Sequence, residues 1–328
     1  MSNSTPSSVD LPLTSEPAED KLEDLLALCL SGGGYRAMLF HLGTLWYLND
    51  AGYLPKLDRV SSVSGGSITA GVLATRWKQL QFDATGKAAN FGDAVVAPLR
   101  KMAATTIDAG SVLGGIFTPG TSVSDRVIKG YKKHLFGEST LQDFIDKPRF
   151  VINATNVQTG SLFRFSKPYI ADYRIGRIMK PTTSVAEAVA ASSAFPPILS
   201  PARLDFQHSQ WTELQTDVCG RPPFTTKIVL TDGGVYDNMG IETAWKRCKR
   251  VLISDGGARV AGRAFGAVAQ AAAPPVDRTR VHARAAPDTL ERVPEVGHSQ
   301  PVRASVVHHH DVHLGALPRP PEVGRGVG

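Results

Sequence analysis

The clearest pattern of apolar and polar residues lies near the N-terminal end of the chain. Residues 26–30 form a short apolar run, typical of a strand buried on both faces of a parallel sheet. The turn 31–34 (Ser-Gly-Gly-Gly) follows, and apolar residues then recur at helical spacing up to Gly52. A second predicted strand, residues 57–63, runs into the turn 64–66 (Ser-Gly-Gly) and another helical pattern. Both glycine turns are expected at one edge of a parallel sheet, the edge where open α/β folds bind ligands.

Further helices and strands are predicted downstream. The helical patterns cover residues 99–107, 125–135 and 185–194, and the extended patterns cover residues 149–157, 161–166, 227–230 and 251–254. The two helical pieces between residues 90 and 145 are interpreted as a cap over the ligand edge. Basic and aromatic residues at 129–136 fit a membrane-facing surface or, more simply, the solvated side of an amphipathic helix.

The turn at residues 31–34 has the composition of an anion site. Backbone N–H groups at a helix N-terminus carry partial positive charge, which suits a bound phosphate or an oxyanion formed during reaction. The pattern Gly32-x-Gly34-x-x-Ala37 is weak evidence alone, because short glycine patterns recur by chance. Taken alone, a tight turn that needs small residues for helix–strand packing is the simpler explanation.

Ser64 lies at the second turn, where a strand passes directly into a helix. A serine flanked by glycine at such an elbow projects its Oγ from a strained backbone at the end of a helix dipole, as a nucleophile does. The alternative is an ordinary N-cap serine, which stabilises a helix by about 1 kcal/mol. Ser67 is the competing nucleophile, but it falls inside the predicted helix and is expected to point away from the first turn.

Two aspartates follow predicted strands in glycine turns and are candidates for the base that activates a serine. Asp232 comes directly after the strand at 227–230, and Asp255 follows the strand at 251–254. An Asx turn that caps local backbone amides explains an Asp-Gly pair equally well. Asp237 and Asn238 are expected to order the loop that follows Asp232.

Five motifs together resemble the patatin-like phospholipase family and its cytosolic phospholipase A relatives. The first two are SGGGYRAM at the glycine turn and VSGGS at the serine elbow. The other three are residues 150–155 (FVINAT), residues 191–196 (ASSAFP) and residues 231–234 (TDGG). They stand in the family's order, and the resemblance covers residues 26–257. Asp232 is preferred to Asp255 because its sequence continues VYDNMG, as in the family.

The resemblance implies a fold, a mechanism and a set of site residues. The fold is a three-layer α/β/α patatin-like sheet with the active site at the carboxyl ends of the strands. Ser64 would be the nucleophile and Asp232 the base of a Ser–Asp dyad that lacks histidine. The amides of Gly32, Gly33 and Gly34 would form the oxyanion hole. Arg36 and Gly65 would contact substrate, Arg36 near its phosphate.

No metal or other cofactor is implied for this chemistry. The chain departs from the family pattern at Ser62 and Ala37, small residues where many members have glycine. The predicted substrate is a carboxylic ester of a phospholipid or related acyl lipid, met at a membrane surface. The sequence does not decide which ester bond is cut or whether the acyl group passes to water or to another acceptor. It also leaves the oligomeric state open.

Composition divides the chain into three parts. Residues 1–20 are polar and predicted disordered, residues 21–257 form the catalytic domain, and residues 258–328 read as a low-complexity tail, either disordered or the product of a reading-frame change. No secretory signal and no apolar run long enough to span a bilayer is present. The net charge of +6 suits an anionic membrane surface, and no nucleic-acid recognition motif appears. Three scattered cysteines predict reduced thiols and a cytoplasmic protein, peripheral at membranes.

Three alternative functions remain at this stage. A Ser-His-Asp hydrolase would need a histidine after the acid, which leaves tail residues such as His282 and His298. A non-catalytic module would use residues 32–36 to bind phosphate or a lipid head group. A family member that lacks its last structural layer would be inactive in spite of its motifs.

Overall fold

A computed structural model describes residues 22–104, 122–257 and 303–308 of the chain. The strands are β1 (Glu23–Leu30), β2 (Arg59–Val63), β3 (Arg149–Asn156), β4 (Ser161–Ser166), β5 (Tyr169–Asp172), β6 (Gly176–Met179), β7 (Ala202–Asp205), β8 (Trp211–Thr212), β9 (Lys227–Asp232), β10 (Cys248–Asp255) and β11 (Arg303–His308). The helices are α1 (Gly34–Asp50), α2 (Gly65–Arg76), α3 (Ala97–Ala104), α5 (Val123–Tyr131), α6 (Val185–Ser192), α7 (Gly234–Asp237) and α8 (Glu242–Trp245). The helical and extended segments predicted from the sequence are confirmed, with ends shifted by a few residues, except that residues 105–107 of the helix predicted at 99–107 lie outside the described residues.

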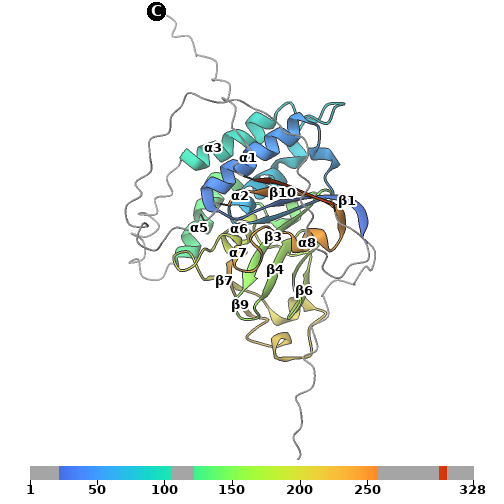
Figure 1. The fold of residues 1–328 in the computed structure, drawn as a ribbon. Helices are drawn as coiled ribbons and strands as arrows, with labels where there is room; N and C mark the ends of the chain where they lie inside the picture. The colour runs from blue at the N-terminus through green and yellow to red at the C-terminus, as the bar shows by residue number, and fades with distance from the viewer. Residues whose placement is uncertain (1–21, 105–121, 258–302, 309–328) are drawn as a thin grey trace, which may run out of the picture.

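The strands form one mixed sheet in the order β11-β10-β1-β2-β3-β4-β5-β6-β8, and β9 pairs with both β3 and β7 (Figure 1). Strands β11, β10, β1, β2 and β3 run parallel, as βα units require. From β3 onward the neighbours β4, β5, β6 and β8 are antiparallel. The sheet therefore changes from parallel to antiparallel pairing at β3, which pairs with β2, β4 and β9.

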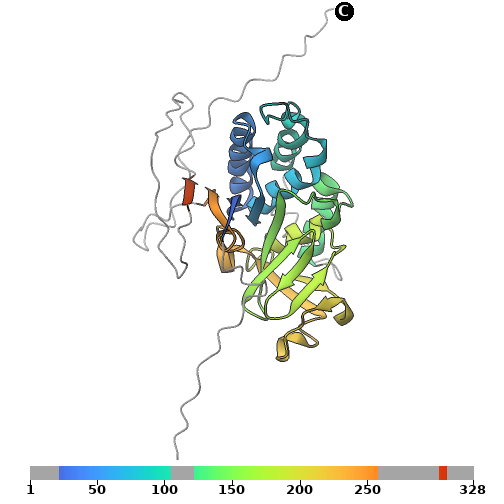
Figure 2. The same ribbon diagram turned by 90° about the vertical axis from the view of Figure 1, so that its right-hand side faces the viewer.

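The sequence of β1 explains why the sheet is covered on both faces. Leu26, Leu28 and Leu30 join the large core under α1 and α2, while Ala27 and Cys29 belong to a smaller cluster with α8 and β10. Figures 1 and 2 show α1, α2 and α3 gathered on one side of the sheet. The predicted three-layer α/β/α arrangement is confirmed.

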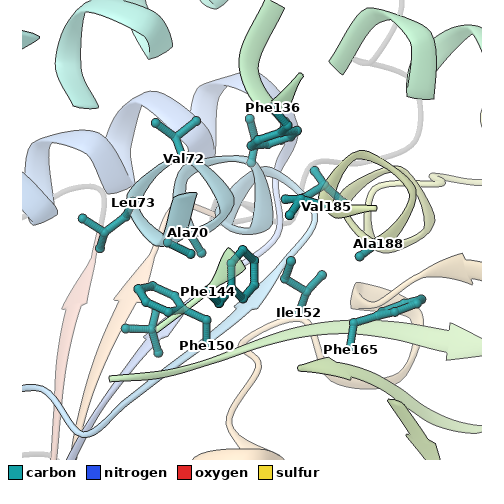
Figure 3. Packing of buried hydrophobic residues seen from close by; sticks show 14 of the residues in the cluster. Ala70, Val72, Leu73, Phe136, Phe144, Phe150, Ile152, Phe165, Val185 and Ala188 are labelled. Carbon is teal, nitrogen blue, oxygen red and sulfur yellow. The ribbon is translucent and has the colours of Figure 1, made fainter. Parts of the chain in front are cut away.

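Helices α2 and α6 pack side by side on the sheet above β3 (Figure 3). Gly71 of α2 makes this close approach possible, because a Cβ added there would lie 3.0 Å from the Phe136 ring and 3.3 Å from Val189 of α6. The helix of small residues predicted at 185–194 thus contacts a neighbouring helix, as its composition suggested.

Two features differ from the sequence reasoning. The strand before Asp232 runs antiparallel to β3, a direction that its sequence did not indicate. Residues 303–308, placed by prediction in a disordered or aberrant tail, form β11 and pair in parallel with β10. The rest of that tail, including His282 and His298, and the predicted disordered residues 1–20 lie outside the described residues.

Two other findings concern the whole described part of the chain. Its cysteines Cys29, Cys219 and Cys248 are all free and buried. Within the same residues, no helix has both the length and the apolar composition needed to span a membrane.

A buried histidine ties α1 to the sheet. His41 Nε2 lies 2.9 Å from the Ser31 carbonyl oxygen, and its Nδ1 lies 2.8 Å from Ser254 Oγ of β10. Because a carbonyl only accepts, Nε2 carries the proton and Nδ1 accepts from Ser254. Burial lowers the pKa of His41 to about 4, so the ring is neutral in the folded protein.

We predict that His41 makes the fold weaker in acid. The unfolded chain protonates this histidine near pH 6.5, while the folded chain does so only at about pH 4. Between these values the unfolded state binds more protons. The free energy of unfolding therefore decreases as the pH is lowered, by up to about 1.4 kcal/mol per pH unit. Urea unfolding from pH 4 to 7 measures this slope. The variant His41→Gln should be less stable overall but have a shallower slope, and equal slopes would contradict the prediction.

Candidate active site

The ends of β2 and β9 meet head to head beside β3. Val63, the last residue of β2, pairs with Asn153 of β3, and Asp232, the last residue of β9, pairs with the next residue, Ala154. Because β2 is parallel and β9 antiparallel to β3, the two strands run toward each other along the same side of it. Ser64, which follows Val63 directly, therefore arrives at Asp232.

The backbone at Ser64 has the strained shape of an elbow. Its φ of 51° and ψ of −119° lie in a region that L-residues rarely adopt. The next two positions accept only glycine, because a Cβ on Gly65 would overlap the Gly34 carbonyl and one on Gly66 would overlap the Leu30 carbonyl. The chain thus turns from β2 into α2 within two residues and leaves the Ser64 side chain at the turn.

The Ser64 hydroxyl lies beside the Asp232 carboxylate as a donor, an interaction that lowers the pKa of this carboxyl. The other donor to this carboxylate is the Gly234 N–H, 2.7 Å from Oδ1. Ser64 is 6% exposed and Asp232 is 4% exposed. Burial raises the pKa of Asp232 above its ordinary value, although the two hydrogen bonds lower it.

The competing serine and aspartate lie away from this pair. Ser67 is fully buried, and its Oγ is 3.1 Å from Ser62 Oγ and 2.9 Å from Ser192 Oγ, beneath the elbow. Asp255 accepts the Gly257 N–H at 2.8 Å and supports its own turn at the end of β10. Neither residue lines the cavity described next.

A cavity of about 680 Å³ opens beside Ser64 and Asp232. Its wall is mostly apolar, and among the described residues no histidine lines it. The lining residues come from the two glycine turns, α5, the segment after α6, and the turn after β9: Gly33, Gly34, Tyr35, Ser64, Gly65, Ile68, Val127, Tyr131, Ser193, Phe195, Ile198, Leu199, Asp232, Gly234, Val235 and Asn238. The cavity can hold an apolar chain with one reactive group at the serine.

The sequence model of the patatin-like phospholipase family matches residues 28–245. This chain belongs to the patatin-like phospholipase family. The match covers the end of β1, both glycine turns and Asp232, so the family resemblance of the five motifs is confirmed. The comparison with curated proteins found no match.

The comparison with solved structures matched, among others, two proteins. Human GIVD cytosolic phospholipase A2 is 13% identical over 71% of this chain and 43% of its own, with a TM-score of 0.42. VipD from Legionella pneumophila is 19% identical over 71% of this chain and 50% of its own, with a TM-score of 0.35. This patatin-like chain thus spans half or less of the length of each of these proteins.

The glycine turn differs in one respect from the family-based expectation. The Gly32 N–H donates to the Asn238 carbonyl at 2.9 Å, so this amide holds the loop after β9 and does not face the cavity. Gly33 and Gly34 line the cavity and adopt φ values of +136° and +66°. Two of the three predicted amides are therefore available to a ligand in this patatin-like site.

The two predicted substrate-contacting residues have different positions. Gly65, at the start of α2, lines the cavity beside Ser64. Arg36 is exposed on the first turn of α1 and is not among the lining residues. The family resemblance placed Arg36 near a substrate phosphate, and its guanidinium would have to reach the cavity from outside its mouth.

Sequence reasoning missed Tyr131, a tyrosine that lines the cavity. Tyr131 Oη lies 3.3 Å from Ser193 Oγ, and because Ser193 donates to the Val189 carbonyl at 2.7 Å, the tyrosine donates to Ser193. Burial raises the pKa of Tyr131 to about 12, and the nearby Asp232 carboxylate adds to this effect. Tyr131 lay in a segment noted for its basic and aromatic residues, and nothing in that pattern indicated that it faces the site.

Proposed function

We propose that this chain is a serine acyl hydrolase that cleaves carboxylic ester bonds of phospholipids or related acyl lipids. The observation that carries the proposal is the meeting of Ser64 and Asp232, at facing strand ends, in the wall of an apolar cavity. Membership of the patatin-like phospholipase family supports the same class of substrate. Phosphate binding alone would not require a strained serine bonded to a buried carboxylate.

The proposed reaction has two halves. Asp232 takes the Ser64 proton as Oγ attacks the ester carbonyl, and the amides of Gly33, Gly34 and Gly65 bind the oxyanion of the tetrahedral intermediate. The intermediate collapses to an acyl-serine, and Asp232 returns the proton to the departing alcohol. Water then attacks the acyl group with Asp232 as base, the fatty acid leaves, and Ser64 is protonated again.

The carboxylate is suited to act without a histidine. A base works best when its pKa approaches the working pH, and burial moves the pKa of Asp232 in that direction. The Ser64 hydroxyl lies beside this carboxylate in the cavity wall, so the proton can pass from serine to acid without a group between them. The apolar wall around the pair also excludes water, which strengthens the amide–oxyanion interaction.

Replacing either member of the pair should abolish hydrolysis. Ser64→Ala removes the nucleophile and Asp232→Asn removes the base, so each should lower the release of fatty acid by at least about 1,000-fold. The measurement is product analysis by mass spectrometry with a phospholipid of defined acyl chains, which also identifies the bond cut.

Asp255→Asn is the matched control, because Asp255 is the other aspartate that ends a strand in a glycine turn. It should retain most of the activity. Equal fatty-acid release by the wild type and both dyad variants would contradict the proposal. No release by the wild type from any ester, together with intact ligand binding, would favour the non-catalytic or the inactive alternative.

The pH dependence should report the buried carboxylate. Hydrolysis needs ionised Asp232, so kcat/KM should fall as the pH drops through the pKa of this residue. Because burial raises that pKa, the acid limb should lie above the ordinary aspartate value of about 4. A kcat/KM profile from pH 4 to 9 with a soluble ester measures it, and a limb at or below pH 4 would contradict this role.

The mouth of the cavity has the properties of a lipid-contacting surface. Phe195, Ile198 and Val235 line the cavity and are 62%, 50% and 59% exposed. Exposed apolar side chains of this size that surround a pocket are typical of an interaction site. We infer that this apolar rim contacts the membrane from which the acyl chain enters.

The rim should be needed for binding to vesicles. In the Ser64→Ala background, which prevents turnover, Phe195→Ser with Ile198→Ser should weaken cosedimentation with phosphatidylcholine vesicles by about tenfold or more, because two apolar contacts are lost. Val218→Ser with Val157→Ser is the control, since these residues are 63% and 50% exposed but lie outside the cavity lining. Equal binding by both double variants would show that the rim makes no specific contact with lipid.

A further inference from the structure

We propose that residues 192–194, at and just after the end of α6, set the position of the nucleophile relative to the acid, with the Ser192 hydroxyl as a positioning group. This inference rests on the proposed roles of Ser64 and Asp232. It concerns a segment that contacts both residues through hydrogen bonds but contains neither. We call residues 192–194 the bridge.

On the nucleophile side, the bridge holds the backbone of the elbow. Ser192 Oγ accepts the Ser64 N–H at 3.0 Å and donates to the Asn153 carbonyl at 2.6 Å. Ser192 is fully buried, so no water can replace its hydroxyl. The hydroxyl thus connects the strained residue to β3 at the residue that pairs with Val63.

On the acid side, the same segment holds the end of β9. The Asp232 N–H donates to the Ala194 carbonyl at 3.0 Å, and the Gly233 N–H donates to the Ser192 carbonyl at 3.1 Å. The Thr231 hydroxyl also donates to the Ala194 carbonyl, at 3.1 Å. Ser192 therefore bonds the nucleophile through its side chain and the acid's neighbour through its backbone.

The bridge matters because nothing covalent joins the two strand ends. β2 and β9 are held in line by β3 on one side, and the bridge supplies the second support. Without the Ser192 hydroxyl, the N–H of a strained, buried residue would lose its partner and the elbow would relax toward a less strained shape. A displacement of about 1 Å in a reacting group can lower a rate by about 100-fold.

The test compares Ser192→Ala with Ser166→Ala in the full chain. Ser166 is the matched control, because it is 1% exposed and its hydroxyl donates to the Tyr169 carbonyl at 2.7 Å, on a strand that does not border the cavity. Both variants should lose similar thermal stability. Ser192→Ala should lower kcat by about 10- to 100-fold with little change in KM, while Ser166→Ala should keep both constants.

The acid limb of kcat/KM gives a readout that a merely structural role would not move. The hydrogen bond from Ser64 lowers the pKa of Asp232, so displacing the serine should shift the limb of Ser192→Ala to higher pH. If Ser192→Ala does not fold, the nearly isosteric Ser192→Cys, whose sulfur accepts hydrogen bonds weakly, should show the same shift.

The outcomes separate this inference from the proposed function. A wild-type chain that neither hydrolyses esters nor is labelled at Ser64 by a fluorophosphonate would overturn the function itself. An active wild type, with Ser192→Ala or Ser192→Cys equal to Ser166→Ala in kcat and acid limb, would overturn only the role of the bridge. A fall in kcat together with a shifted limb would support it.

Discussion

The site depends on one register along β3. Asn153 and Ala154 are consecutive residues, yet one pairs with the end of a parallel strand and the other with the end of an antiparallel strand. Backbone pairing alone therefore brings Ser64 to Asp232, before any side chain makes a contact. A shift of one residue would turn the side chains of either strand to the opposite face, so the buried faces of the sheet hold this register in place.

The same arrangement explains why a buried carboxylate lies beside an apolar cavity. Two strand ends that meet inside a sheet lie under the helices that cover it, and Ile68 of α2 and Val127 of α5 place apolar side chains in the cavity wall beside the pair. The carboxylate is consequently buried, which raises its pKa, while the glycine turn supplies amides from the neighbouring strand β1. Burial of the acid and space for an apolar substrate thus have one common origin.

The sequence was most informative where a rule is local. Residues 26–30 predicted β1, because a strand buried on both faces carries a continuous apolar run, and residues 57–63 predicted β2. The glycine turns predicted Ser64, and the family motif indicated Asp232. The antiparallel direction of β9 could not be predicted, since the short run Lys-Ile-Val-Leu carries no information about direction. Nor could the bond from Gly32 to Asn238, because it joins segments about two hundred residues apart; it leaves two of the three glycines of the first turn for the cavity.

The proposed use of a dyad in place of a triad also fits this geometry. A histidine between serine and acid needs room for its ring, and here strand pairing places Ser64 and Asp232 side by side in the cavity wall. The imidazole of His41 lies instead on the far side of the glycine turn, where it holds Ser31 against β10 and stays neutral. The buried histidine thus fixes the glycine turn that lines the cavity, and in the proposed reaction the chemistry falls to the carboxylate at the end of β9. The meeting of two strand ends decides which residues that reaction needs.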